Sequence, residues 1–137
     1  MRIKVLLLLV TAPATLSGQE PLPPVVIQGL DLLRSGNCDD AFTKWTSTWA
    51  EAQKQQMTDS CQVMLDNGGS MHGYDVLKRI RISAHLERIY LLLLYQKQPI
   101  YMMLLAYKPN SEWMINAVNW NSDPDKVASA DIIPPDR

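Results

Sequence analysis

The two cysteines are the residues whose spacing points to the most definite chemistry. Cys38 and Cys61 each fall in a stretch with helical apolar spacing, and a turn at residues 49–50 separates the two stretches. If the two helices fold back antiparallel about that turn, the thiols lie level with each other because both are equally far from it. We therefore predict a Cys38–Cys61 disulfide, with two buried free thiols as the alternative.

One aspartate and several tyrosines could support acid–base catalysis. Asp75 adjoins Tyr74, and Tyr90 and Tyr101 fall on neighbouring expected strands. A carboxyl group buried among tyrosines would have a raised pKa and could act as a base, which defines an alternative as a small isomerase or lyase. No nucleophile motif or phosphate-binding loop accompanies this group, so we assign no catalytic residue and expect no cofactor.

The histidines and the other carboxylates favour structural roles. His72 and His85 flank the first expected strand and would lie roughly 40 Å apart on a straight strand. That separation is too large for a shared metal ion, so no metal site is expected. A turn centred on Ala84 places Glu87 opposite Arg81, which predicts a cross-strand ion pair.

Residues 1–18 have the pattern of a cleavable secretion signal. Two basic residues precede a continuous apolar run over residues 5–10, which is too short to span a bilayer, and small residues follow. Cleavage after Ala14 and cleavage after Gly18 both fit, and a buried strand or a short anchor is the alternative to a signal. We expect a secreted or periplasmic protein that has no membrane contact after cleavage and meets an oxidising environment.

The elements that position these residues follow from the apolar periodicity. Residues 19–24 form a stiff, proline-rich lead-in. Helical spacing, caps and glycine stops then predict three helices, which begin near Pro24, Asn37 and Glu51. One domain over residues 19–125 is expected, with a flexible polar tail at 126–137.

From Tyr74 the apolar period changes from helical spacing to strict alternation. Four strands are expected, over residues 74–82, 86–95, 100–108 and 112–121. Short connections rich in turn residues make them antiparallel neighbours. The predicted fold class is therefore α+β, with N-terminal helices packed on a curved four-stranded antiparallel sheet.

The expected sheet is apolar on both faces, whereas antiparallel sheets usually have one dry face and one wet face. One face is aliphatic, and we expect the helices to cover it. The other face carries tyrosine, methionine and tryptophan, which suit an interface or an amphipathic pocket. A slip of one residue in register would exchange the two faces. The polar and aromatic members of the second face form the predicted ligand-binding set: Tyr74, Lys78, Tyr90, Tyr101, Asn116 and Trp120.

Composition and charge limit the classes of partner. The 137 residues are 47% hydrophobic and 20% charged, with a formal net charge of −1. Such a chain can bury a core, and it carries no basic stripe for phosphate contacts. A nucleic-acid partner is therefore not expected.

The order of three helices and a curved four-stranded meander resembles the nuclear transport factor 2-like superfamily, in particular small exported bacterial members. The segments that carry the resemblance lie in the second half of the chain: Gly73-Tyr74-Asp75-Val76-Leu77-Lys78-Arg79, Arg88-Ile89-Tyr90, Pro99, Tyr107-Lys108-Pro109, Trp113 and Asp123-Pro124-Asp125. The resemblance implies a cone-shaped fold that holds ligands between the concave face of the sheet and the helices. The superfamily includes isomerases, dehydratases and non-catalytic binding modules, and the isomerase pattern of a cavity aspartate with a paired tyrosine and acid does not match this chain.

Together these observations favour an exported, non-enzymatic domain that binds a small apolar ligand or a protein partner. A homodimer formed through the sheet is one version of this hypothesis. The alternatives are the isomerase or lyase described above and a structural accessory or immunity-type protein.

Overall fold

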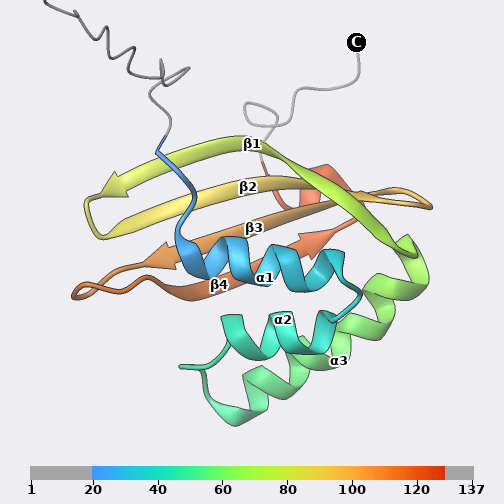
Figure 1. The fold of residues 1–137 in the computed structure, drawn as a ribbon, viewed down its shortest axis with the longest axis horizontal. Helices are drawn as coiled ribbons and strands as arrows, with labels where there is room; N and C mark the ends of the chain where they lie inside the picture. The colour runs from blue at the N-terminus through green and yellow to red at the C-terminus, as the bar shows by residue number, and fades with distance from the viewer. Residues whose placement is uncertain (1–19, 129–137) are drawn as a thin grey trace, which may run out of the picture.

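The computed structural model describes residues 20–128, in which three helices precede a curved four-stranded sheet (Figure 1). The elements are α1 Pro24–Arg34, α2 Cys38–Trp45, α3 Glu51–Gly68, β1 Met71–Ser83, β2 Leu86–Tyr95, β3 Pro99–Tyr107, β4 Met114–Asn121 and the 3-10 turn η1 Pro124–Lys126. The strands pair antiparallel in the order β1-β2-β3-β4. The predicted α+β fold class is confirmed. The predicted signal segment and residues 129–137 of the predicted tail lie outside the described residues.

The helix boundaries follow from local sequence features. Pro24 occupies the first position of α1, where its missing N–H costs no hydrogen bond. Gly36 follows α1 with φ of 82°, a left-handed conformation that other residues rarely adopt. Asn37 precedes α2 as predicted but makes no side-chain cap, and Asp39 and Asp40 in the first turn oppose the helix dipole instead. None of the helices within residues 20–128 is long and apolar enough to cross a membrane.

Close contact between α1 and α2 depends on a glycine. The indole of Trp45 lies directly against Gly29, so that a Cβ atom added at Gly29 would lie 2.1 Å from an indole carbon. The indole Nε1 donates a hydrogen bond of 2.9 Å to the carbonyl oxygen of Val25. Trp45 is buried, so its one polar atom is satisfied by the helix it packs against.

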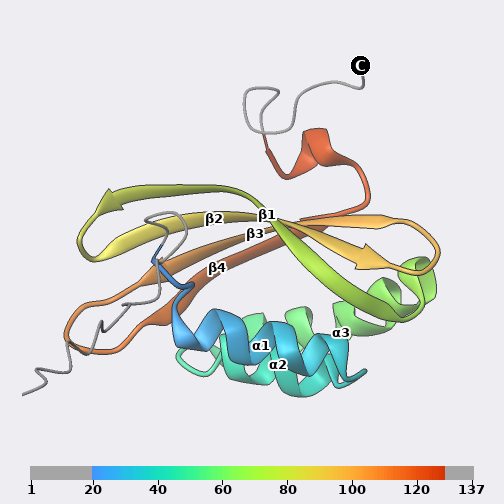
Figure 2. The same cartoon turned by 45° about the horizontal axis from the view of Figure 1, so that its top comes forward.

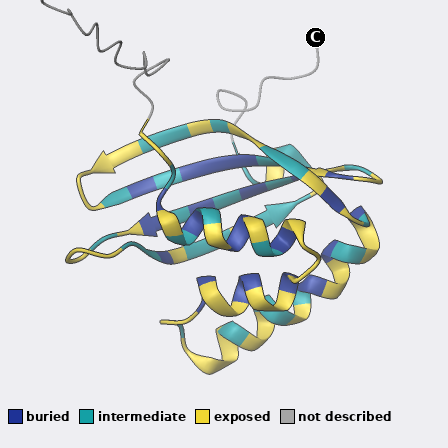
Figure 3. Cartoon of the chain, in the orientation of Figure 1, coloured by how far each residue is buried: buried dark blue, intermediate teal, exposed yellow. Residues whose placement is uncertain are grey.

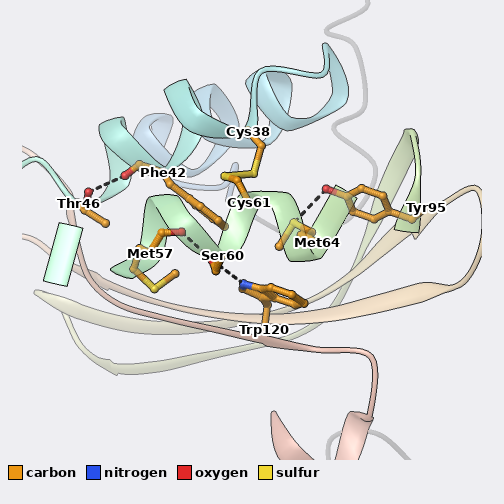
Figure 4. The surroundings of a disulfide bond; sticks show 9 residues. All are labelled: Cys38, Phe42, Thr46, Met57, Ser60, Cys61, Met64, Tyr95 and Trp120. Atoms are coloured by element: carbon orange, nitrogen blue, oxygen red, sulfur yellow. Dashed lines mark hydrogen bonds between the residues drawn. A yellow bond between two sulfur atoms is a disulfide. The ribbon is translucent and has the colours of Figure 1, made fainter. Parts of the chain in front are cut away.

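A disulfide joins α2 to α3, as the spacing of the cysteines predicts (Figure 4). Cys38 and Cys61 are both buried, and their Cα atoms are 5.7 Å apart. The bridge closes a loop with a sequence separation of 23, which by the chain-entropy estimate stabilises the fold by about 3 kcal/mol. One turn further along α3, the hydroxyl of Tyr95 donates to the sulfur of Met64, and burial raises the pKa of Tyr95 to about 12.

The helices lie on one side of the sheet only, and η1 lies on the other (Figure 2). Buried residues are concentrated on β2, β3 and the facing sides of the helices (Figure 3). Many of the strand residues that face the helices have no or almost no exposed surface: Ile89, Leu91, Leu93, Ile100, Met102, Leu104, Ala106 and Ile115. All of them except Ile100 belong to the aliphatic set expected beneath the helices, whereas Leu77 and Trp113 of that set are partly exposed.

The strand register differs from the simplest hairpin pairing in two ways. Arg81 lies opposite Glu87 as predicted, whereas Tyr107 lies opposite Leu86 on one side and Met114 on the other. The simplest hairpins would pair Tyr95 with Ile100 and Tyr107 with Glu112, so the β2–β3 register is offset by two residues, and the β3–β4 register by two up to Ile115 and by three from Ala117 onward. The even offset leaves the side chains of β2 and β3 on their predicted faces.

Four register irregularities do exchange faces. Three lie in β1, at His72, Leu77 and Ile82, and one lies in β4, at Asn116. Such β-bulges insert one residue into one strand, and each side chain beyond them points to the opposite face. Near the β4 irregularity the indole Nε1 of Trp49 donates a hydrogen bond of 2.8 Å to the carbonyl oxygen of Ile115, which ties the helical layer to the edge strand.

The close packing at Gly29 predicts a size limit at that position. Gly29→Ala should lower the free energy of unfolding by about 1–3 kcal/mol, because Trp45 or α1 must shift to admit a methyl group. Gly73→Ala is the matched control, since a Cβ there meets only one leucine methyl at 3.8 Å and should change stability by less than about 1 kcal/mol. Urea unfolding of both variants measures the difference, and equal stability of the two would contradict the packing described.

Candidate functional site

A cavity of about 560 Å³ lies where the lead-in to α1 crosses the end of the sheet. Its walls come from the lead-in, the first turn of α1, the β1–β2 end of the sheet and the residue that precedes β4. Apolar side chains form much of the wall, and the residues concerned are Pro21, Leu22, Pro23, Ile27 and Trp113. The wall also contains Pro24, Gln28 and four charged residues, two arginines and two glutamates: Glu20, Arg79, Arg81 and Glu87.

A buried ion pair forms the inner wall of this cavity. Glu87 is 2% exposed, and its two carboxylate oxygens accept hydrogen bonds from Nε and Nη2 of Arg79 at 2.5 and 3.2 Å. This two-bond geometry is the strongest pairing available to a guanidinium and a carboxylate. Glu87 was expected to pair with Arg81, its cross-strand partner, and that prediction is wrong. Arg79 is a diagonal neighbour on the same face and, at 18% exposed, lies deeper beneath the lead-in.

Arg79 also holds the lead-in in place. Its Nη1 donates to the backbone carbonyl of Glu20, and its Nη2 lies 3.4 Å from the carbonyl oxygen of Pro21. Prolines in this segment leave few backbone N–H groups to pair with other elements. The guanidinium therefore supplies the hydrogen bonds that fix an otherwise irregular segment above the sheet.

The outer wall carries a second, exposed ion pair. Nη2 of Arg81 lies 2.5 Å from a carboxylate oxygen of Glu20, and the two side chains are 49% and 65% exposed. Ion pairs this open to solvent contribute little to stability because water and salt screen them. The cavity thus combines a structural ion pair, Arg79–Glu87, with an exposed ion pair, Arg81–Glu20, whose partners are easily separated by water.

The six residues of the predicted ligand-binding set do not share one face. Tyr74 and Trp120 point to the helical side, where Tyr74 packs on the core and the indole Nε1 of Trp120 donates to the hydroxyl of Ser60 at 3.3 Å (Figure 4). The other side of the sheet, the outer side, holds Lys78 with its register partner Tyr90, and Tyr101 with its register partner Leu92. Asn116 lies at the β4 irregularity and is exposed. The bulges at Leu77 and Asn116 cause this division, because each one exchanges the faces of part of an edge strand.

The outer face of the sheet presents a half-covered apolar surface. Tyr90 at its centre is 7% exposed, and its neighbours Leu92, Met103 and Leu105 are partly exposed. At one edge the side chain of Asn119 donates to the backbone carbonyl of Lys126, which holds η1 on this side. We call the patch of Tyr90, Leu92, Met103 and Leu105 the outer patch.

The candidate base lies outside the cavity. Asp75 is exposed on β1, opposite Leu92, and so belongs to the outer side of the sheet. The one buried carboxylate in the cavity is Glu87, which Arg79 already engages. His72 and His85 are both exposed, and residues 20–128 contain no group of three or more metal-ligating side chains.

Sequence reasoning missed the cavity because two of its walls are far apart in the chain. The alternation of Arg79 and Arg81 on one strand, with Glu87 just beyond the turn, was a detectable sign of clustered charge at that end of the sheet. The approach of the lead-in was not detectable, since its proline content indicates stiffness but not direction.

The inner ion pair generates a stability prediction. Arg79→Met should lower the free energy of unfolding by about 3–5 kcal/mol, because it leaves the carboxylate of Glu87 buried without a partner. Replacing both residues, as Arg79→Met with Glu87→Leu, should recover most of that loss. Denaturant unfolding compares the variants, and a double variant as unstable as the single one would show that Arg79 acts through the lead-in alone.

Comparisons of the chain with protein-family models, with curated proteins and with solved structures return no match. The functional conclusions below therefore depend on the geometry of the cavity and of the outer patch.

Proposed function

We propose that this chain is an exported, non-enzymatic domain that binds a small apolar ligand in the cavity beneath its lead-in. The observation that carries the proposal is the cavity itself, about 560 Å³ in volume, with Leu22, Ile27 and Trp113 in its wall. Sites for small molecules are typically concave, mainly apolar and of about 300–1,000 Å³, with a few placed polar groups. The two arginines and two glutamates supply those groups.

Export is supported by the disulfide. Disulfides persist in secreted and periplasmic proteins and are rare in reducing compartments. The Cys38–Cys61 bridge is compatible with such a location, and the pattern of residues 1–18 is that of a signal segment. Cleavage after Ala14 or after Gly18 retains Glu20, so either site leaves the wall of the cavity intact.

The resemblance to the nuclear transport factor 2-like superfamily supports the same proposal. Members of that superfamily hold ligands between the concave face of a sheet and its helices. Here the cavity lies between the covered side of the sheet, through Arg79 and Glu87, and the start of α1, through Ile27. Fold analogy does not specify the ligand, which has to follow from the residues in the wall.

The enzymatic alternative has a different geometric requirement. An isomerase or lyase that used Asp75 as its base would have to bind its substrate on the outer side of the sheet, because Asp75 is exposed there. Within the cavity, Glu87 already accepts two hydrogen bonds from Arg79, which favours a structural role over proton transfer. This arrangement supports the non-enzymatic proposal.

The outer patch supports a second candidate function, a dimer formed through the sheet. Helices cover one face of the sheet, and the outer patch of Tyr90, Leu92, Met103 and Leu105 has no charged member. Lys78, Asp75 and Arg88 border the patch on the same face, so a second copy that packs on it has to leave these charges at the rim of the interface. Tyrosine and methionine are also enriched in protein interfaces.

Binding in the cavity is testable with an uncharged fluorescent probe. N-phenyl-1-naphthylamine should bind saturably, with one site per chain, and gain fluorescence on leaving water. Ile27→Glu places a carboxylate in the apolar wall and should weaken binding by roughly tenfold or more. Val63→Glu adds the same charge on an exposed site of α3 and should leave binding unchanged. Absence of saturable binding, or equal binding by both variants, would count against the cavity as the site.

Dimerisation through the outer patch is testable by light scattering after size-exclusion chromatography. The protein should show the mass of two chains, and Leu105→Glu should convert it to one chain because the dimer would bury that carboxylate. Val63→Glu is again the control for added charge and should leave the mass unchanged. A single-chain mass for the unaltered protein at all concentrations would eliminate the second candidate.

A further inference from the structure

We infer that the ligand of the cavity carries one acidic head group, a carboxylate, which binds Arg81 in the place now taken by the side chain of Glu20. The inference rests on the proposed function and specifies the class of ligand as a small amphiphilic monocarboxylate. It follows from the different ways in which the two arginines of the cavity are engaged.

The hydrogen-bonding capacity of Arg79 is largely used by the protein. Its guanidinium donates to both carboxylate oxygens of Glu87 and to the backbone carbonyls of Glu20 and Pro21. Glu87 is buried, so separating the pair would leave a charge without a partner in a dry environment. A ligand therefore has no reason to displace the partners of Arg79.

Arg81 is engaged differently. Its guanidinium has five N–H donors. Within the described part of the chain it makes one hydrogen bond, from Nη2 to the carboxylate of Glu20 at 2.5 Å. Both side chains are about half exposed or more, so this contact exchanges readily with solvent. The backbone of Glu20 is held by Arg79 independently, so the carboxylate can swing away while the lead-in stays in place.

The contact also shows which chemistry the guanidinium accepts at this position. The carboxylate of Glu20 is bound at the edge of the apolar wall formed by Leu22, Ile27 and Trp113. A free carboxylate can form two parallel bonds with an arginine, whereas the tethered glutamate forms one. A ligand head group would therefore gain a bond that Glu20 does not make.

The charge of the wall favours a single negative charge on the ligand. With the side chain of Glu20 withdrawn, the charged residues that line the cavity are Arg79, Arg81 and Glu87, which leave one positive charge uncompensated. A monoanion neutralises this charge, whereas a neutral ligand would not replace the interaction that Arg81 loses when Glu20 moves away. Because the rest of the wall is apolar apart from Gln28, the body of the ligand should be a hydrocarbon chain or ring.

Displacement of N-phenyl-1-naphthylamine by two ten-carbon compounds tests the inference on the full mature chain at pH 7. Sodium decanoate should displace the probe at a concentration at least about tenfold lower than decan-1-ol. Arg81→Gln should abolish this preference and leave displacement by decan-1-ol unchanged. Glu20→Gln should lower the decanoate concentration needed to displace the probe roughly two- to fivefold, because the competing carboxylate is gone. Arg34→Gln removes an equal charge from the exposed end of α1 and should leave displacement of the probe by either compound unchanged.

The outcomes separate this inference from the proposed function. If decan-1-ol and decanoate displace the probe equally, or if Arg81→Gln retains the preference for decanoate, the cavity still binds apolar ligands and the head-group inference is wrong. If the probe binds and neither compound displaces it, the head-group inference is likewise wrong. If the probe does not bind, the proposed function itself fails and the inference fails with it.

Discussion

The exclusion of water from the aliphatic side of β2 and β3 is the constraint on which the rest of the structure depends. Buried side chains of β2, β3 and β4 line that side, and the three helices cover them. The helices can do so because α1 and α2 approach each other closely at Gly29 and Trp45, and because a disulfide joins α2 to α3. At the β1–β2 end of this layer the alternation of β2 places Glu87 on the same dry side. Arg79 compensates that carboxylate and also donates to the backbone carbonyl of Glu20, which holds the lead-in along the cavity.

One layer of helices cannot cover a sheet that is apolar on both sides. The three helices of residues 20–128 all lie on one side, and the outer patch is left with η1 at its edge. Natural sheets avoid such surfaces unless something packs on them, since exposed apolar patches promote association. This imbalance is why the cavity and the outer patch, on opposite sides of one sheet, support separate functional hypotheses.

Most of the fold could be predicted from local patterns, because those patterns are strong in this chain. Turn residues such as Gly36 and Pro99 mark element boundaries, and the change of apolar period at Tyr74 falls three residues after the start of the sheet at Met71. The faces of β2 and β3 were also predictable, since neither of the central strands contains a bulge. The edge strands were not, because nothing in their alternation distinguishes Leu77 or Asn116 from a regular strand residue. The bulges in the edge strands divided the six predicted ligand-binding residues between two faces, and none of the six lines the cavity, which depends on a long-range contact with the lead-in.

The contacts at the outer wall of the cavity join Glu20, the first described residue, to β1, a strand that lies much later in the sequence. Glu20 and Arg81 are separated by 61 positions in the chain, and the segment that carries Glu20 contains no helix or strand. Forming such a contact costs the conformational entropy of closing the loop between its two residues, and no ladder of backbone hydrogen bonds beside it offsets that cost. Loss of the contacts that Glu20 and Pro21 make with the two arginines breaks no bond within a helix or a strand ladder, whereas Leu22 packs against the core and the carbonyl of Pro23 accepts from the first turn of α1. The stretch of the lead-in that can separate from the sheet without disturbing the core therefore ends at Pro21.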